Sequence, residues 1–129
     1  WILRRYTWIG RDRRKVMEEV LPRYVDGLMI HWRESAEDPE EKALFARIDA
    51  GEPVTPQDIA ADRLLFGDPD DVIAQIERYR RETGCEHVHA AFGAGMPAHD
   101  TEYSTLGAFE AQAEMIRLFG QYVIPHFRR

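Results

Sequence analysis

Apolar and polar positions along the chain predict a strand followed by a long helix. Residues 2–9 combine β-branched and aromatic side chains with two arginines, which is typical of a partly buried strand. Gly10 breaks this strand, and Asp12 is suited to cap a helix that runs to about residue 33. Within that helix, apolar side chains recur at a spacing of four: Val16, Val20, Tyr24 and Leu28. Pro22 interrupts the stripe and is expected to kink or split the helix, because it lacks an N–H donor.

Three helix starts share one pattern, in which a capping side chain precedes a proline and an acidic residue follows. The segments are Asp38-Pro39-Glu40-Glu41, Thr55-Pro56-Gln57-Asp58 and Asp68-Pro69-Asp70-Asp71. The first predicted helix ends at Gly51 and the third at Gly84, while the second is short. Residues 10–63 are therefore predicted to form a helical insertion between two more regular parts of the chain.

The second half of the chain predicts one more strand and one more helix. A short apolar run occupies residues 64–66, a strand is predicted at 86–92, and a flexible loop at 93–97. The last helix is expected from about residue 105 to 123, ended by Pro125. Strands separated by helices predict an α/β fold with two parallel strands. Two such strands form a poor sheet alone, so the pattern implies neighbours that the chain lacks.

Composition restricts the classes of partner. The chain has 129 residues, a net charge of −6 and 44% hydrophobic residues, which is typical of one globular domain and untypical of a nucleic-acid-binding module. No apolar run approaches the roughly 20 residues that span a bilayer. The single cysteine, Cys85, cannot form an internal disulfide, which favours a cytoplasmic location. The chain begins at Trp1, inside the first predicted strand, and this favours a fragment of a longer protein.

Three stretches carry a family resemblance. They are residues 66–76, where Gly67-Asp68-Pro69 and Val72 open a helix; residues 79–88, where a helix ends at Gly84 before a strand; and Gly95-Met96-Pro97, followed at a distance by residues 119–125. In this order and spacing, residues 64–127 resemble the end of the luciferase-like flavin-dependent monooxygenases.

The resemblance implies that the chain is the C-terminal part of a (β/α)8 TIM-type barrel. Residues 2–9 and 86–92 would be its last two strands, and residues 10–63 an insertion that can carry a mobile active-site lid. Loops that follow strands face the active site of such a barrel. The residues expected to contact reduced FMN, or a deazaflavin, and a small organic substrate are therefore Phe92, Gly93, Gly95 and Met96. The resemblance places the catalytic residues and the main flavin contacts outside this chain, which alone is expected to bind no cofactor.

Other readings of the chemistry remain open. His87 and His89 share one face of the predicted strand and could begin a metal site, with His99, Asp100 or Glu102 as a third ligand. As neutral hydrogen-bonding groups they need no metal, and we predict none. Cys85 is expected to be a small buried residue at a helix-to-strand junction. The alternative to an enzyme fragment is a small non-catalytic α/β module that associates with itself. Its bare strand edges would be covered by further copies or, in the fragment, by the missing part of the barrel.

Overall fold

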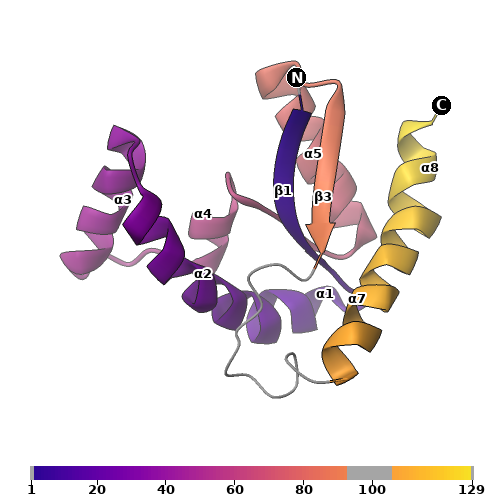
Figure 1. The fold of residues 1–129 in the computed structure, drawn as a ribbon, viewed down its shortest axis with the longest axis horizontal. Coiled ribbons are helices and arrows are strands. Elements are labelled where there is room, and N and C mark those ends of the chain that lie inside the picture. Colours follow the sequence, from indigo (N-terminus) through magenta and orange to yellow (C-terminus); the bar gives the residue numbers. More distant parts are fainter. Residues whose placement is uncertain (1, 93–105, 129) are drawn as a thin grey trace.

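The structure of the chain is a computed structural model that describes residues 2–92 and 106–128 (Figure 1). In chain order, the elements are β1 (Ile2–Ile9), α1 (Arg13–Lys15), the π-helical segment η1 (Val16–Val20), α2 (Leu21–Ser35), α3 (Pro39–Asp49), α4 (Pro56–Ala60), β2 (Leu64–Gly67), α5 (Pro69–Thr83), β3 (His87–Phe92), α7 (Leu106–Leu118), the π-helical segment η2 (Phe119–Val123) and α8 (Ile124–Phe127).

The strands form one open sheet in the order β2–β1–β3, and both pairings are parallel. β1 pairs with β3 from Ile2 opposite His87 to Thr7 opposite Phe92. The predicted α/β class and the parallel strands are confirmed, but the predicted number of two strands is wrong, because β2 is a third. β2 pairs only with the carboxyl half of β1, from Tyr6 opposite Leu64 to Ile9 opposite Gly67. This sheet does not confirm a barrel.

The described helices cover mainly one face of the sheet. Side chains alternate across a strand, so Leu3, Thr7 and Ile9 share the face that α5 covers behind the sheet in Figure 1, and all three are buried. At β3 the same face packs on η2, where the rings of Phe92 and Phe119 meet edge to face at 5.5 Å. A single core extends from this face to η1, α2 and α7.

The opposite face, which we call the open face, carries Ile2, Arg4 and Tyr6 of β1 and His87 and His89 of β3. Ile2 is 65% exposed, Arg4 and both histidines are exposed, and Tyr6 is half-buried. Among the described residues, cover is confined to the carboxyl end of this face, where Trp8 packs on Tyr24 of α2 with ring centroids 5.9 Å apart. A parallel sheet that leaves one face to solvent is unusual, because such sheets are normally buried on both sides.

The capping chemistry predicted from the sequence is confirmed at the four helix starts for which it was predicted. Asp12, Asp38, Thr55 and Asp68 each accept a hydrogen bond from a backbone N–H in the first turn. Thr55 and Asp68 belong to reciprocal capping boxes. Gly84 ends α5 with φ at +69°, the left-handed conformation that favours glycine.

Pro22 and Pro125 neither break nor end their helices. Each lies at the second position of an α-helix that continues directly from a π-helical segment, η1 before Pro22 and η2 before Pro125. The wider π turn accommodates a residue that cannot donate to the preceding turn and whose ring would collide with it. The prediction that Pro125 ends the last helix is therefore wrong, since the helix continues through α8 to Phe127.

Tyr24 makes the stability of the fold sensitive to alkaline pH. Its side chain is 2% exposed, and this burial, with a smaller effect of Tyr6, raises its pKa above the ordinary value of about 10. Since the folded-state pKa is raised, the full contribution of the neutral phenol is present below pH ~10. It is lost as pH rises toward the folded-state pKa, by up to about 1.4 kcal/mol per pH unit. Urea unfolding at a series of pH values above 9 is expected to show this loss in the wild type and a smaller one in Tyr24→Phe. Equal pH dependence in the two proteins would contradict it.

Candidate functional site

The carboxyl ends of the strands meet at one edge of the sheet, as the parallel arrangement requires. The backbone N–H of Gly10, which follows β1, donates to the carbonyl of Gly67 at the end of β2 at 3.0 Å. Phe92 ends β3 at the same edge, and its ring packs on Phe119 of η2. The other predicted cofactor contacts, Gly93, Gly95 and Met96, lie outside the described residues.

A small cavity of about 230 Å³ opens at this edge between β1 and α7. Its walls are mainly apolar, and the side chains that line it include Trp8, Val16, Val20 and Met115. Asp12 and Glu114 of α7 are the carboxylates in its lining, and Arg11 donates to Glu114 at 2.9 Å. This hydrogen bond holds the pKa of Glu114 below its usual value, so the carboxylate is ionised at neutral pH and poorly suited to supply a proton.

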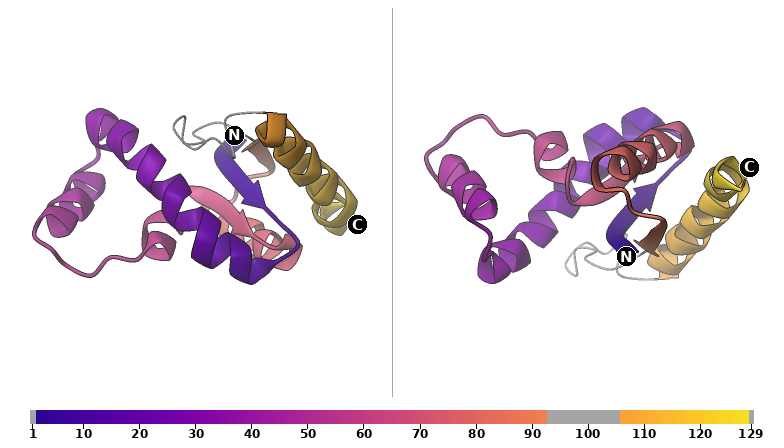
Figure 2. Two further views of the ribbon diagram at one scale, coloured as in Figure 1. Left: turned by 90° about the horizontal axis from the view of Figure 1, so that it is seen from below. Right: turned by 90° about the horizontal axis from the view of Figure 1, so that it is seen from above.

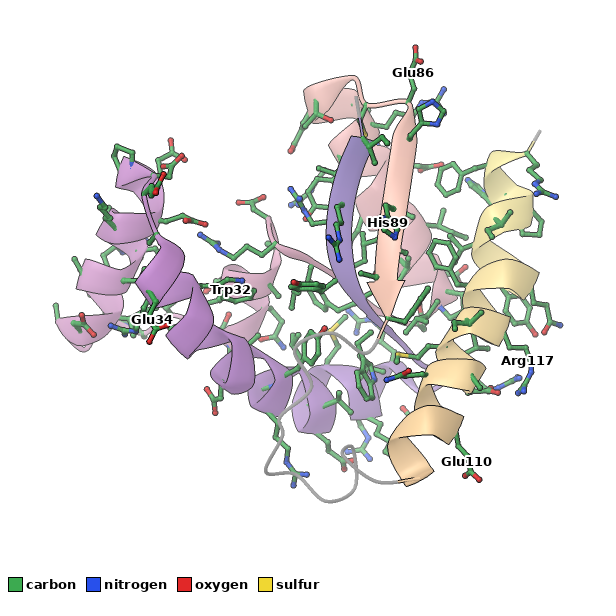
Figure 3. All side chains as sticks on the ribbon, viewed as in Figure 1. Trp32, Glu34, Glu86, His89, Glu110 and Arg117 are labelled. Atoms are coloured by element: carbon green, nitrogen blue, oxygen red, sulfur yellow. The ribbon has the colours of Figure 1, made fainter. Side chains whose placement is uncertain are left out.

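The two histidines of β3 both lie on the open face, in agreement with their spacing. In the sheet register, His89 (labelled in Figure 3) lies directly beside Arg4. His87 lies beside Ile2. An arginine next to His89 disfavours a bound cation. Within residues 2–92 and 106–128, no three histidine, cysteine or acidic side chains lie close enough to hold a metal ion. His99, Asp100 and Glu102 lie outside this part of the chain.

Cys85 is buried and reduced, directly after the glycine that ends α5. Its backbone N–H donates to Thr83 Oγ1 at 3.3 Å. The expectation of a small buried residue at this junction is confirmed.

The predicted insertion, residues 10–63, contains α1, η1, α2, α3 and α4. α2 leads away from the sheet, and α3 lies at the opposite end of the molecule from α7 and α8 in both views of Figure 2. An ion pair between Arg33 and Asp49, 2.8 Å apart, ties α3 back to α2 and lowers the pKa of Asp49. A role for this insertion as a lid stays a prediction.

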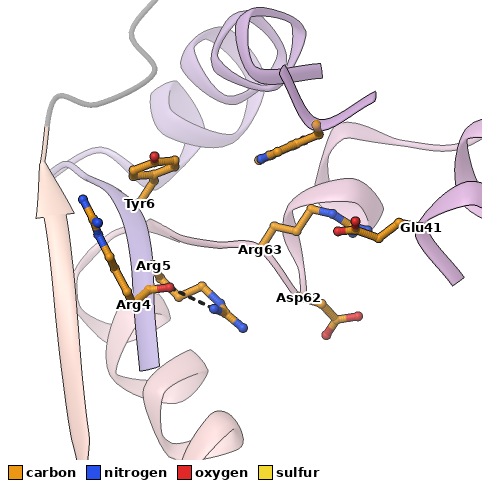
Figure 4. A pocket seen from close by; sticks show the side chains of 7 residues that line it. Arg4, Arg5, Tyr6, Glu41, Asp62 and Arg63 are labelled. Carbon is orange, nitrogen blue, oxygen red and sulfur yellow. Dashed lines mark hydrogen bonds and ion pairs between the residues drawn. The ribbon is translucent and has the colours of Figure 1, made fainter. Parts of the chain in front are cut away.

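A second cavity, of about 370 Å³, lies beside the amino half of β1, where β2 no longer pairs with it (Figure 4). Its lining brings together three arginines and two aromatic side chains with two carboxylates: Arg4, Arg5, Tyr6, Trp32, Glu41, Asp62 and Arg63. We call it the arginine cavity. The sequence prediction missed it, although two consecutive arginines inside a strand were a signal, because one of them must lie on each face of the sheet.

Comparison with known proteins adds no relative from which a role could be transferred. No protein-family model matches the chain, and no curated protein or solved structure is significantly similar to it. None of the helices in the described residues is long and apolar enough to cross a membrane.

Proposed function

We propose that this chain is the C-terminal part of a (β/α)8 barrel enzyme, a flavin-dependent monooxygenase of the luciferase-like type that acts on a small organic substrate with O2. The observation that carries the proposal is the open face of the sheet. In a closed barrel, helices cover the outside, and the inner face is filled by side chains from other strands. Here α5 and η2 cover one face, while Ile2 on the other is 65% exposed. A barrel would enclose that face.

Exposed apolar side chains on α7, η2 and α8 support the same proposal. Ile116, Tyr122 and Ile124 are each more than a third exposed. In a barrel, each outer helix packs between two neighbours, and the last one closes the ring. These side chains would then be covered by elements outside this chain.

The carboxyl edge of the sheet is where such an enzyme would hold its flavin. There the chain would contribute the segment at Gly10 and the expected contacts Phe92, Gly93, Gly95 and Met96. The described cavity at this edge, about 230 Å³, is below the range of about 300–1,000 Å³ typical of ligand sites. The walls present are apolar and fit the edge of a ring system, but they do not enclose one. We therefore expect reduced FMN, or a deazaflavin, to be held mainly by the rest of the barrel. The flavin would supply the oxygen chemistry, and this chain would supply apolar walls that exclude water.

The pairing of β2 with β1 provides a structural test of the proposal. Each strand of a barrel pairs along both edges, and β2 already occupies one edge of β1 from Tyr6 to Ile9. Only Ile2–Arg5 of that edge remain for a preceding barrel strand. A structure of the whole protein is therefore expected to show another strand against this part of β1.

Mass and flavin binding test the proposal directly. We expect the protein isolated from its source to be larger than 15.0 kDa and to bind reduced FMN or reduced deazaflavin F420 at a ratio of one per chain. The 129 residues alone, titrated with the same flavins, are expected to bind neither stoichiometrically. A native mass of 15.0 kDa, or tight flavin binding by the isolated chain, would contradict the proposal. A native 15.0 kDa protein that forms dimers without flavin would support the alternative, a self-associating module whose copies cover the same apolar side chains.

The buried, reduced state of Cys85 is compatible with a cytoplasmic location, which we propose for the enzyme.

A further inference from the structure

We propose that the arginine cavity binds a small organic anion, in which a carboxylate or phosphate group is held by guanidinium side chains and an attached ring lies against Tyr6 and Trp32. The cavity is at the uncovered edge of β1 and is formed by residues of this chain alone. A barrel strand paired with Ile2–Arg5 would fill this cavity, so the proposal does not rest on the monooxygenase assignment and applies to the chain with this edge of β1 uncovered.

The cavity exists because β2 is short. β2 begins at Leu64, opposite Tyr6, so no strand in the described structure lies against Ile2–Arg5 on that side of β1. The turn before β2 places Asp62 and Arg63 across this gap, and the far wall comes from Trp32 of α2 and Glu41 of α3. At about 370 Å³, the opening falls within the size range of small-molecule sites.

Stacking on aromatic rings positions the arginines without neutralising them. The guanidinium carbon of Arg4 lies 6.0 Å from the ring centre of Tyr6, that of Arg63 lies 5.9 Å from Trp32, and that of Arg5 lies 5.0 Å from Tyr79. Such contacts orient a guanidinium through its flat face. The N–H groups that do not already donate to the protein, such as Nη2 of Arg5, suit the oxygens of a carboxylate or phosphate.

Several donors in the cavity have no acceptor among the described residues. Nε of Arg5 and Nε of Arg63 are both buried without a hydrogen-bond partner. Arg63 uses its other nitrogens on the Ile59 carbonyl at 3.2 Å and, more weakly, on Glu41 at 3.4 Å. Arg5 Nη1 donates to the Arg4 carbonyl at 2.9 Å. Both Nε atoms are almost inaccessible to solvent, so a ligand in the cavity would meet the Nη groups of these side chains instead.

The charges in the cavity favour an anion. Three guanidinium groups face two carboxylates, and one of these, Asp62, is shared with Arg78, whose Nη2 lies 3.3 Å away. Glu41 forms an ion pair with Arg63 at 3.4 Å. Arg4 lines the rim of the cavity, is exposed and has no ion pair among the described residues; in Figure 4 its side chain leaves β1 on the side away from Arg63 and Glu41. This local surplus of positive charge occurs in a chain whose net charge is −6.

The test is a titration of the chain with benzoate and phenyl phosphate at constant ionic strength, with benzyl alcohol as the uncharged probe. We expect both anions to bind saturably, with a Kd of about 1 mM or tighter, and benzyl alcohol not to bind. The tighter of the two anions identifies the preferred acidic group. Absence of saturable anion binding, or equal binding of benzyl alcohol, would overturn the proposal.

Two variants connect the binding to this cavity. Arg4→Gln removes a guanidinium that makes no hydrogen bond or ion pair in the described structure, so the fold is expected to be unaffected while affinity falls about tenfold. Arg63→Lys keeps the charge but loses the planar fork, and affinity is again expected to fall. Arg14→Gln is the matched control, since Arg14 pairs with Glu18 on an exposed helix surface and does not line the cavity. Unchanged affinity in Arg4→Gln, with its melting temperature equal to that of the wild type, would also overturn the proposal.

Discussion

Replacing Leu65 by alanine is expected to lower the free energy of unfolding by about 3–4 kcal/mol, more than half of the stability of a marginally stable domain. Leu65 lies in the middle of β2, beside Thr7, and its exposed fraction is 0%. Its side chain belongs to the single core, which is formed largely on the covered face of the sheet. Truncation removes buried methyl groups and leaves a cavity that well-packed surroundings fill only in part.

This loss is large relative to the free energy of unfolding expected for this fold. Ordinary domains are stable by about 5–15 kcal/mol, and a sheet buried on one face only is expected to lie near the lower limit. Urea unfolding followed by circular dichroism measures the change in midpoint. Ile116→Ala is the control, because Ile116 is 56% exposed and its truncation is expected to cost less than about 0.5 kcal/mol. Similar midpoints for Leu65→Ala and the wild type would show that β2 does not contribute to the folded core.

The hydrogen bonds that cap the helices could be predicted from the sequence. Asp68 accepts from the N–H of Asp71, and the Asp71 carboxylate accepts in return from the N–H of Asp68, at 2.9 and 3.1 Å. Both partners lie within one helical turn, so the four-residue pattern contains all the information needed. The same holds for Thr55 with Asp58, and for Gly84 at the end of α5.

Features that depend on distant partners could not be read in this way. β2 has only four residues, and it is a strand because β1 lies beside it more than fifty positions earlier in the sequence. Its apolar run alone is equally compatible with a turn of buried helix. The arginine cavity likewise joins residues 4 and 5 to residue 63, and the closure of its walls depends on where β2 begins. Hydrophobic periodicity contains no information on that register.

The π-helical segments show a third limit on predicting this structure from its sequence. The sequence identified Pro22 and Pro125 as positions at which a regular helix cannot continue, which is correct for an α-helical turn. Whether the chain then stops, kinks or widens is decided by packing. Val20 is the last residue before α2 and Val123 the last before α8, and both side chains are buried. A widened turn at these positions therefore keeps each helix packed against the core.

Replacing Gly67 by alanine is expected to cost about 3 kcal/mol of stability, for two reasons that act together. Gly67 has φ at +121°, which side-chain-bearing residues rarely adopt and which costs about 1–3 kcal/mol. A Cβ at this position would also lie 2.5 Å from Oδ2 of Asp71 and 2.6 Å from its Cβ. Asp71 would have to move, and it holds both the capping box of α5 and a contact with Arg13 at 3.1 Å. Losing a helix cap costs about 1 kcal/mol in itself.

Alanine variants at two further glycines serve as comparisons for the backbone cost and the collision. Gly84 also has a positive φ, +69°, but a Cβ there would meet nothing within 4 Å, so Gly84→Ala is expected to report the backbone cost alone, about 1 kcal/mol. Gly120 in η2 has neither a positive φ nor a close neighbour, and Gly120→Ala is expected to be neutral or slightly stabilising. The difference between Gly67→Ala and Gly84→Ala then measures the collision with Asp71 together with the larger backbone cost of φ at +121°. If the two variants unfold at the same urea concentration, Asp71 moves aside without cost, and the junction between β2 and α5 is not the tightly packed turn that its geometry implies.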